Sequence, residues 1–280
     1  MIFGSTGWRR VAYDPRLAQW AKRARQIAIG VAQDPKMQAD WLVCERTWFV
    51  GVDALPNAAN GDLPGAEFPA RLRSLCPGPY HKAQVSITYP GYPKPREGES
   101  NAALQFRKNR DAAHVDGILG IGTPKRRFVS EPHAYILGMP LNDFDAGASP
   151  MVLWEGSHQI MQDAFQDAFE GLTDAQIRET DITDLYKEVR KHVFNTCNRV
   201  EVHANVGEAY VLHPMCLHGV APWASKATAQ PEGRMIAYFR PEVRSALDWL
   251  NIGQHRCGLG VASIYLRFKR AARPPRRTLS

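Results

Sequence analysis

The sequence predicts a mainly β protein, an antiparallel sandwich or barrel with helices packed on its outside. Three observations support this fold class. After residue 80, short β-rich runs outnumber helical stretches, glycine and proline punctuate those runs, and helices do not alternate regularly with strands. A doubly wound parallel sheet would need that alternation, so the pattern favours antiparallel pairing.

The N-terminal region is predicted to be a helix over 15–34. Apolar residues there recur at helical spacing and form one face, while basic residues occupy the other. The apolar positions are Leu17, Trp20, Ala21, Ala24, Ile27, Ala28 and Val31.

Seven β-rich runs follow. They are AQVSITY (83–89), AHVDGILGIG (113–122), HAYILGMPL (133–141), SPMVLWEG (149–156), EVHANV (201–206), EAYVLHPMCLH (208–218) and RMIAYFRPEV (234–243). Two helical stretches interrupt them. The first follows Ser157 and ends at Gly171, where a glycine can cap a helix. The second begins at Thr173, which has capping-box spacing to Gln176, and extends to about Asn195 with a break near Asp181.

Composition bounds the class of protein. A chain of 280 residues with 44% hydrophobic and 22% charged residues can bury a substantial core as an ordinary globular protein. No apolar run approaches eighteen residues, and the first twenty residues lack the basic-then-apolar order of a secretory signal, so we expect a cytoplasmic protein without membrane contact. Five scattered cysteines without a CxxC pair argue against a disulfide framework and a structural zinc site.

The net charge of +7 is unevenly distributed. From Arg267 onward the tail carries six Lys or Arg and no acid, which leaves about +1 for the rest of the chain. The body shows no basic stripe with interleaved aromatics, so no nucleic-acid partner is expected. We expect the tail over 267–280 to be solvated and mobile, with contact to phosphate or an acidic partner as the alternative.

The tripeptide HVD offers a candidate metal site. On a strand, residues i and i+2 point to the same face, so His114 and Asp116 would project side by side. They supply two of the three ligands of a 2-His-1-carboxylate triad, which holds Fe(II) and leaves positions open for reactants. Alone, such a pair is more often a solvated or hydrogen-bonded surface pair.

The stretch VLHPMCLHGVAPW (211–223) contains two further histidines, His213 and His218. Their offset of five places them on opposite faces of an uninterrupted strand, and it is not the i, i+4 spacing of a helical metal pair. At most one of them therefore joins His114 and Asp116 in a site.

Arg234 begins the apolar run RMIAYF, sixteen residues after His218. An arginine entering an apolar sheet needs an anion, and a carboxylate matches its planar fork. If His218 ends one strand and Arg234 begins its antiparallel neighbour, ligand and carboxylate anchor would lie close together. An exposed arginine, or one paired with Glu232 or Glu242, is the alternative.

In combination these motifs resemble the phytanoyl-CoA dioxygenase superfamily of Fe(II)- and 2-oxoglutarate-dependent oxygenases. The resemblance covers roughly residues 80 to 243 and depends on four stretches in a fixed order. These are HVD (114–116), SPMVLWEGSH (149–158), GEAYVLHPMCLHGVAPW (207–223) and GRMIAYF (233–239).

The resemblance implies a fold, a ligand set and a reaction. The fold would be a double-stranded β-helix, or jelly roll, forming one domain over 1–266 with an N-terminal helical region and a helical insertion near 157–195. Iron(II) would bind His114, Asp116 and His218. The resemblance selects His218 rather than His213 because the distal histidine of the family is followed by a small residue and a turn. The cosubstrate 2-oxoglutarate would place its far carboxylate on Arg234. Dioxygen would then decarboxylate it to succinate, with hydroxylation of a C–H bond of a small-molecule substrate.

Several details qualify this ligand set. Halogenating relatives replace the carboxylate with a small residue, so Asp116 implies hydroxylation or a related oxidation. Pro222–Trp223 stands where a proline–asparagine pair is often found, and Ile236 replaces a polar residue frequent two positions after the arginine.

Other residues receive roles of second rank. Tyr135, on the strand after the metal motif, is expected to reach 2-oxoglutarate. Trp154 and His158 are expected to line the substrate pocket, although a core tryptophan and a helix-capping histidine are equally compatible with the sequence. Arg110 is assigned to an anionic substrate, with surface solvation as the alternative.

Three other functions were weighed. A jelly-roll protein of the same descent that binds a ligand or metal without turnover is the main alternative. A cupin-like metalloenzyme without cosubstrate is disfavoured because cupins commonly open with HxH rather than HxD. A hydrolase has little support, since no GxSxG is present and Ser157 beside His158 does not define a nucleophile–base pair.

Overall fold

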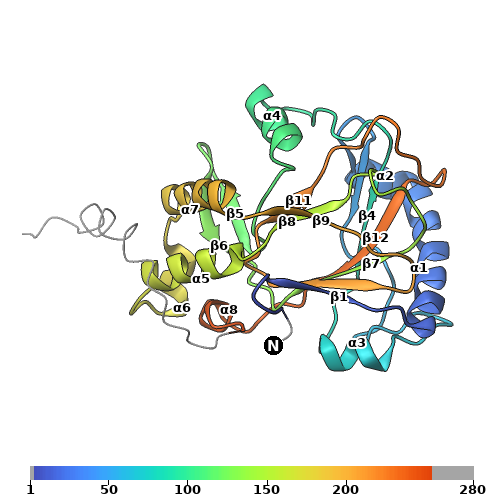
Figure 1. Cartoon of the computed structure of the whole chain (residues 1–280), viewed down its shortest axis with the longest axis horizontal. Helices are drawn as coiled ribbons and strands as arrows, with labels where there is room; N and C mark the ends of the chain where they lie inside the picture. The colour runs from blue at the N-terminus through green and yellow to red at the C-terminus, as the bar shows by residue number, and fades with distance from the viewer. Residues whose placement is uncertain (1–2, 254–280) are drawn as a thin grey trace, which may run out of the picture.

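The computed structural model describes residues 3–253, in which two antiparallel sheets pack face to face (Figure 1). The larger sheet has the strand order β1-β10-β7-β12-β4-β3-β2, the smaller has β11-β8-β9, and β5 and β6 form a separate hairpin. The predicted basic tail over 267–280 lies outside the described residues.

The strands are short. They are β1 (Trp8–Val11), β2 (Leu42–Val43), β3 (Trp48–Gly51), β4 (Gln84–Thr88), β5 (Ile118–Ile121), β6 (Arg126–Val129), β7 (Ile136–Pro140), β8 (Met151–Trp154), β9 (Arg199–Val202), β10 (Ala209–Leu212), β11 (His218–Val220) and β12 (Arg234–Phe239). The helices are α1 (Pro15–Gln33), α2 (Pro35–Trp41), α3 (Ala70–Leu75), α4 (Asn101–Asn109), α5 (Ser157–Ala168), α6 (Asp174–Glu179), α7 (Thr183–Thr196) and α8 (Ala246–Leu250).

The chain order within the sheets is that of a double-stranded β-helix. From β4 onward the chain passes repeatedly between the two sheets, so that β10-β7-β12-β4 face β11-β8-β9. His114 extends the smaller sheet by an isolated antiparallel bridge to His218, the first residue of β11. Four strands of the larger sheet therefore face three strands and the His114 segment of the smaller sheet, arranged as in a jelly roll, which confirms the predicted fold class.

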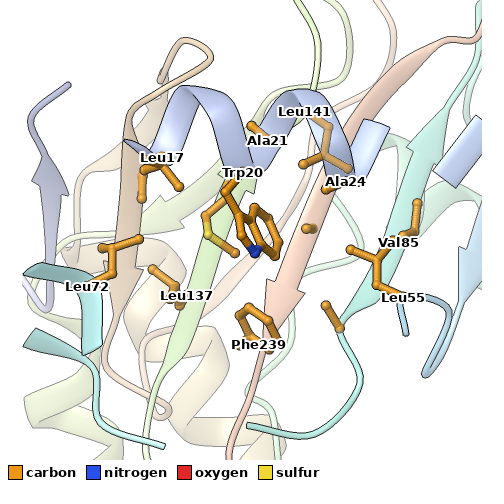
Figure 2. Packing of buried hydrophobic residues seen from close by; sticks show 14 of the residues in the cluster. Leu17, Trp20, Ala21, Ala24, Leu55, Leu72, Val85, Leu137, Leu141 and Phe239 are labelled. Carbon is orange, nitrogen blue, oxygen red and sulfur yellow. The ribbon is translucent and has the colours of Figure 1, made fainter. Parts of the chain in front are cut away.

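Helix α1 covers the outer face of the larger sheet (Figures 1 and 2). Asp14 caps its N-terminus by accepting a hydrogen bond from the Arg16 amide, and a proline follows at the first helical position. Trp20 is fully buried between the helix and the sheet, and its indole nitrogen donates to the Gly61 carbonyl at 2.9 Å. Burial of such a side chain stabilises the fold by about 1.5–3 kcal/mol, so this helix anchors the sheet from outside.

Helices α5 to α8 cover the outer face of the smaller sheet. Helix α5 begins at Ser157, a capping box joins Thr173 and Gln176 at the start of α6, and α7 begins after the predicted break near Asp181. Outward-facing residues of β8, such as Val152 and Trp154, pack against these helices, whereas Met151 and Leu153 point between the sheets. This alternation decides which residues of β8 can reach the interior.

Two predicted strands are interrupted in the structure. The run over 113–122 pairs only at His114 and again as β5, because Gly117, at φ +90°, turns the chain between them. The run over 208–218 ends as β10 at Leu212 and resumes as β11 at His218, since the chain crosses there from one sheet to the other. Strands β1 to β3 and β6 and helices α2, α3, α4 and α8 were not predicted. Within the described range, no helix is long and apolar enough to cross a membrane.

Candidate metal centre

The metal-ligand candidates meet where the chain segment of His114 pairs with β11. The His114 amide donates to the His218 carbonyl at 2.8 Å, and the His218 amide donates to the His114 carbonyl at 3.0 Å. Residues paired in this way project to the same side of a sheet, and Asp116 follows on that side two positions later. The two imidazole rings lie 4.6 Å apart, centroid to centroid.

One carboxylate oxygen faces both imidazoles. Oδ1 of Asp116 lies 3.3 Å from Nε2 of His114 and 3.8 Å from Nε2 of His218. The candidate ligand atoms of the three residues all lie within 4.8 Å of one another. Such spacing allows all three to reach one ion at the ligand distances typical of a divalent metal.

The other ring nitrogens determine which atom is free to bind. Nδ1 of His114 lies 2.9 Å from the Ala112 carbonyl, and Nδ1 of His218 lies 2.9 Å from the Cys216 carbonyl. A carbonyl only accepts, so Nδ1 must carry the proton in both rings, which leaves each Nε2 with a free lone pair. Both lone pairs are on the side of Asp116, as in metal sites whose histidines are oriented by backbone carbonyls.

The protonation states also suit a cation. Burial, together with His114, lowers the pKa of His218 to about 4, so its ring is neutral at pH 7. Burial alone would raise the pKa of Asp116, but Arg240 and the two histidines hold it well below its usual range. The site therefore presents one carboxylate and the Nε2 atoms of two imidazoles, a donor set that matches a divalent transition metal.

Arg240 is a site residue that sequence reasoning missed. Its Nη1 lies 3.3 Å from Oδ2 of Asp116, and its Nη2 donates to the Gln84 side chain. It follows Tyr238 by two positions at the end of β12, the same face as Arg234. Counting alternate positions beyond RMIAYF would have placed it on this face, but not beside Asp116.

A cavity of about 160 Å³ opens beside the three candidate ligands. Its lining is mostly apolar and draws on both sheets; beyond the metal-ligand candidates it includes Trp48, Val50, Tyr92, Ile136, Met151, Val220 and Tyr238. Polar groups enter it from Gln84, Ser86 and Arg240. An apolar cleft with a few convergent polar groups is the usual form of a small-molecule site.

Arg234 lies deeper between the sheets than sequence reasoning placed it. The expectation that β12 is the antiparallel neighbour of β11 is wrong, because the two strands belong to different sheets, and Arg240, not Arg234, is at the metal end of β12. Six residues of extended chain separate the Cα atoms of these two arginines by about 20 Å. The cavity lining includes Arg240 but not Arg234.

Among residues 3–253, Arg234 nevertheless forms no ion pair with a carboxylate. Its side chain is only 1% exposed and lies over the Phe144 ring, yet Nε and Nη1 have no hydrogen-bond partner. Glu232, the alternative partner considered above, instead pairs with Arg25. A buried guanidinium with unpaired donors is costly, so this position favours an anionic ligand.

Thr88 adds a hydroxyl at the same depth. It pairs with Arg234 across β4 and β12, is fully buried, and its Oγ1 also lacks a partner. It shares a face of β4 with Gln84 and Ser86, which line the cavity. An unpaired hydroxyl beside a guanidinium with two unpaired nitrogens is a donor set suited to a carboxylate.

Tyr135 is not brought to the centre. Its neighbour Ile136 lines the cavity, so strand alternation directs Tyr135 to the opposite face of the larger sheet, under α1. There its hydroxyl donates to the Pro77 carbonyl at 2.7 Å. This placement contradicts the expected contact with 2-oxoglutarate.

The three residues assigned to substrate also lie elsewhere. Trp154 points outward from β8 and packs against the Phe194 ring at 5.1 Å. His158, at the start of α5, lies 5.0 Å from the ring of His213, away from the cavity. Arg110 is exposed and lies over Phe194 at 4.8 Å. Their positions near the family-like motifs in the sequence did not show in which direction their side chains point.

Gly219 permits the approach of the segment that precedes the metal motif. A Cβ at this position would lie 2.1 Å from the Asp111 carbonyl oxygen, which accepts a hydrogen bond from the Val220 amide at 2.9 Å. Arg199 holds the same Asp111 by two hydrogen bonds, of 2.7 and 3.0 Å. The glycine after His218 is therefore required for close packing at the bridge.

Comparisons with known proteins give matches only among solved structures. No protein-family model matches the sequence, and no curated protein matches it. AviO1 from Streptomyces viridochromogenes Tue57 matches with 15% identity over 86% of this chain and 91% of its own, at a TM-score of 0.46. EctD from S. alaskensis, solved with 2-oxoglutarate and 5-hydroxyectoine, matches with 14% identity over 85% and 73%, at 0.45.

A third match is SnoK, described as a non-heme alpha-ketoglutarate-dependent carbocyclase from nogalamycin biosynthesis. It has 12% identity over 86% of this chain and 81% of its own, at a TM-score of 0.39. Because identities are this low and the TM-scores are below 0.5, we draw no argument about substrate or reaction from these matches.

Proposed function

We propose that this protein is an Fe(II)- and 2-oxoglutarate-dependent dioxygenase that hydroxylates a C–H bond of a small molecule, related to the phytanoyl-CoA dioxygenase superfamily. The observation that carries the proposal is the direction of the two Nε2 lone pairs, which point toward one oxygen of Asp116 because both Nδ1 atoms are bound to carbonyls. Two histidines and one carboxylate on one side of an ion are the ligand set typical of non-haem Fe(II) oxygenases.

The second support comes from the unpaired donors between the sheets. In this proposal Arg234 holds the far carboxylate of 2-oxoglutarate, and Thr88 donates its hydroxyl to the same group. Both side chains are buried without a partner for the atoms concerned, so an anion there would satisfy them. A protein that only binds a metal would have no use for a buried arginine with unpaired donors.

The chain's own residues would then perform three tasks. His114, Asp116 and His218 hold the metal, and Arg240 fixes Oδ2 of Asp116 so that Oδ1 faces the ion. The apolar lining around Trp48, Ile136 and Met151 excludes water from the reacting groups. Iron(II) with 2-oxoglutarate and dioxygen supplies the oxidising chemistry, and the protein supplies position and exclusion of water.

Succinate formation tests the proposal. Purified protein is incubated with 2-oxoglutarate and Fe²⁺ in air, alone and with a panel of small carboxylic acids, amines and aromatic compounds. We expect succinate above the level without protein, none without iron, and none under argon. An absence of succinate under every condition, together with tight metal binding, would instead favour the non-catalytic jelly-roll protein.

A further inference from the structure

The segment that carries the metal motif forms one edge of the smaller sheet. Along a strand, successive backbone groups point alternately to the two sides. The amide and carbonyl of His114 face β11. The carbonyl of Ala113 and the amide of Val115 therefore point to the opposite side, away from β11. Among the described residues no strand pairs on that outer side. Val115 and Ala113 are each only 1% exposed, so water cannot replace the missing strand.

Helix α7 supplies the missing partners. The Val115 amide donates to the Tyr186 hydroxyl at 3.0 Å, and Nη1 of Arg190 lies 3.5 Å from the Ala113 carbonyl oxygen. Tyr186 and Arg190 are four positions apart, so they lie one turn apart on the same face of the helix. Together they contact the backbone on both sides of His114.

The two side chains are themselves held by aromatic rings. The Arg190 guanidinium lies 5.2 Å from the Tyr186 ring centroid and 4.6 Å from that of Phe106 on α4. No carboxylate pairs with Arg190 in the part of the chain that the structure describes. An arginine between two ring faces keeps its direction without a salt bridge, which leaves its donors for the backbone.

We propose that Tyr186 and Arg190 are positioning residues of the metal centre. In place of a neighbouring strand, they fix the backbone at Ala113 and Val115, on either side of His114 and directly before Asp116, and so fix the separation of these two metal-ligand candidates. The inference rests on the proposed function only in that these ligands bind a metal. It gives the helical insertion a role beyond covering the sheet.

The test uses Tyr186→Phe, which removes one hydroxyl and keeps the ring. Tyr80→Phe is the matched control, because the hydroxyl of this buried tyrosine also bonds to the backbone, at the Cys76 carbonyl, in the α1 core on the other face of the larger sheet from the cavity. Two quantities are measured: the hydrogen-exchange rate of the Val115 amide in metal-free protein, and the affinity for Co²⁺ with its visible absorption spectrum.

We expect Tyr186→Phe to speed exchange at Val115 and to weaken Co²⁺ binding about tenfold, the lower end of the range for residues that support metal ligands. The altered ligand geometry should also change the Co²⁺ spectrum, whereas Tyr80→Phe leaves all three readouts unchanged. Wild-type Co²⁺ affinity in Tyr186→Phe, or unchanged exchange at Val115, would overturn the proposal.

A second variant covers the case in which Tyr186→Phe does not fold. Arg190→Met keeps the Tyr186 hydroxyl and removes the donor to Ala113, and it should weaken Co²⁺ binding in the same direction. Wild-type affinity in that variant would equally overturn the role of α7. Lack of succinate formation by the wild type would contradict the proposed function alone, since the exchange and Co²⁺ measurements need no turnover.

Discussion

Arg240 and Asp116 form an ion pair in which Nη1 lies 3.3 Å from Oδ2, while Oδ1 of the same carboxylate faces two imidazoles. The guanidinium thus divides the carboxylate into one oxygen held by the protein and one oxygen turned toward the candidate metal position. This division favours binding of an ion through a single carboxylate oxygen, which leaves more coordination positions for reactants.

Substitution of the two histidines in the stretch 211–223 should have different effects, one on metal binding and the other on the stability of the fold. His218→Ala removes a ligand and should abolish tight Co²⁺ binding, whereas His213→Ala should retain it. The latter should instead cost about 2–4 kcal/mol of unfolding free energy, because it opens a cavity and leaves the Ile252 carbonyl and the Met215 amide without their partner. Isothermal titration and urea denaturation check the two effects; loss of Co²⁺ binding in His213→Ala would contradict the assignment.

Replacing Arg234 should have opposite effects on the free protein and on the bound one. Arg234→Met removes a buried guanidinium in which Nε and Nη1 have no hydrogen-bond partner, so the free protein should be at least as stable as the wild type. The rise in Tm that 2-oxoglutarate and Mn²⁺ give the wild type should disappear. Differential scanning fluorimetry with and without 2-oxoglutarate measures both, and a retained shift would remove Arg234 from the cosubstrate site.

The buried pair of His158 and His213 should make the fold sensitive to acid. Burial, with the neighbouring His213, lowers the pKa of His158 to about 3, against about 6.5 in an unfolded chain. Between these values the unfolded state binds more protons, so the stability that this group contributes is complete above pH 6.5 and is lost as the pH falls. At pH 5 the loss is about 2 kcal/mol for this group.

His158→Leu should therefore flatten the fall in Tm between pH 7 and pH 5, and calorimetry over that range measures it. His203→Leu is the control, since His203 is exposed and pairs only with the nearby Glu201. A slope that is the same in His158→Leu and the wild type would show that His158 does not titrate as its burial requires.

Gly219 should tolerate no side chain. In Gly219→Ala the new Cβ meets the Asp111 carbonyl, so the bridge between His114 and His218 must open, with a loss of about 2–4 kcal/mol and of Co²⁺ binding. Gly30→Ala is the contrast: this exposed glycine in α1 has open space around it and should gain about 0.5–1 kcal/mol. Thermal unfolding and Co²⁺ titration of both variants check the prediction.

Residue patterns predicted α1, α5, α6 and α7 and most strands after residue 80, but not α2, α3, α4 and α8. The apolar spacing over 15–34 predicts α1, and the capping box at Thr173 predicts the start of α6. The odd offset between His213 and His218 also argued against a metal shared by the two. The structure separates them for another reason, because the chain crosses between the sheets there and does not continue as one strand.

Side-chain direction at the site was harder to predict. Tyr135 and Trp154 each lie beside a residue that points between the sheets, so a shift of one position reverses the assignment. Arg240 and Tyr186 were missed because their partners, Asp116 and Val115, are 124 and 71 positions away in the sequence. Such contacts follow from the topology of the sheets and not from local spacing.

Anaerobic titration of 2-oxoglutarate into protein loaded with Fe²⁺ tests the central claim most directly, with Arg234→Met and His218→Ala alongside. We predict one iron and one 2-oxoglutarate per wild-type chain, a visible absorption band that appears only when both are present, and no band with His218→Ala. Arg234→Met should form the same band at a much higher 2-oxoglutarate concentration. An unchanged band in His218→Ala, or 2-oxoglutarate that binds equally well without iron, would contradict the assignment of this site.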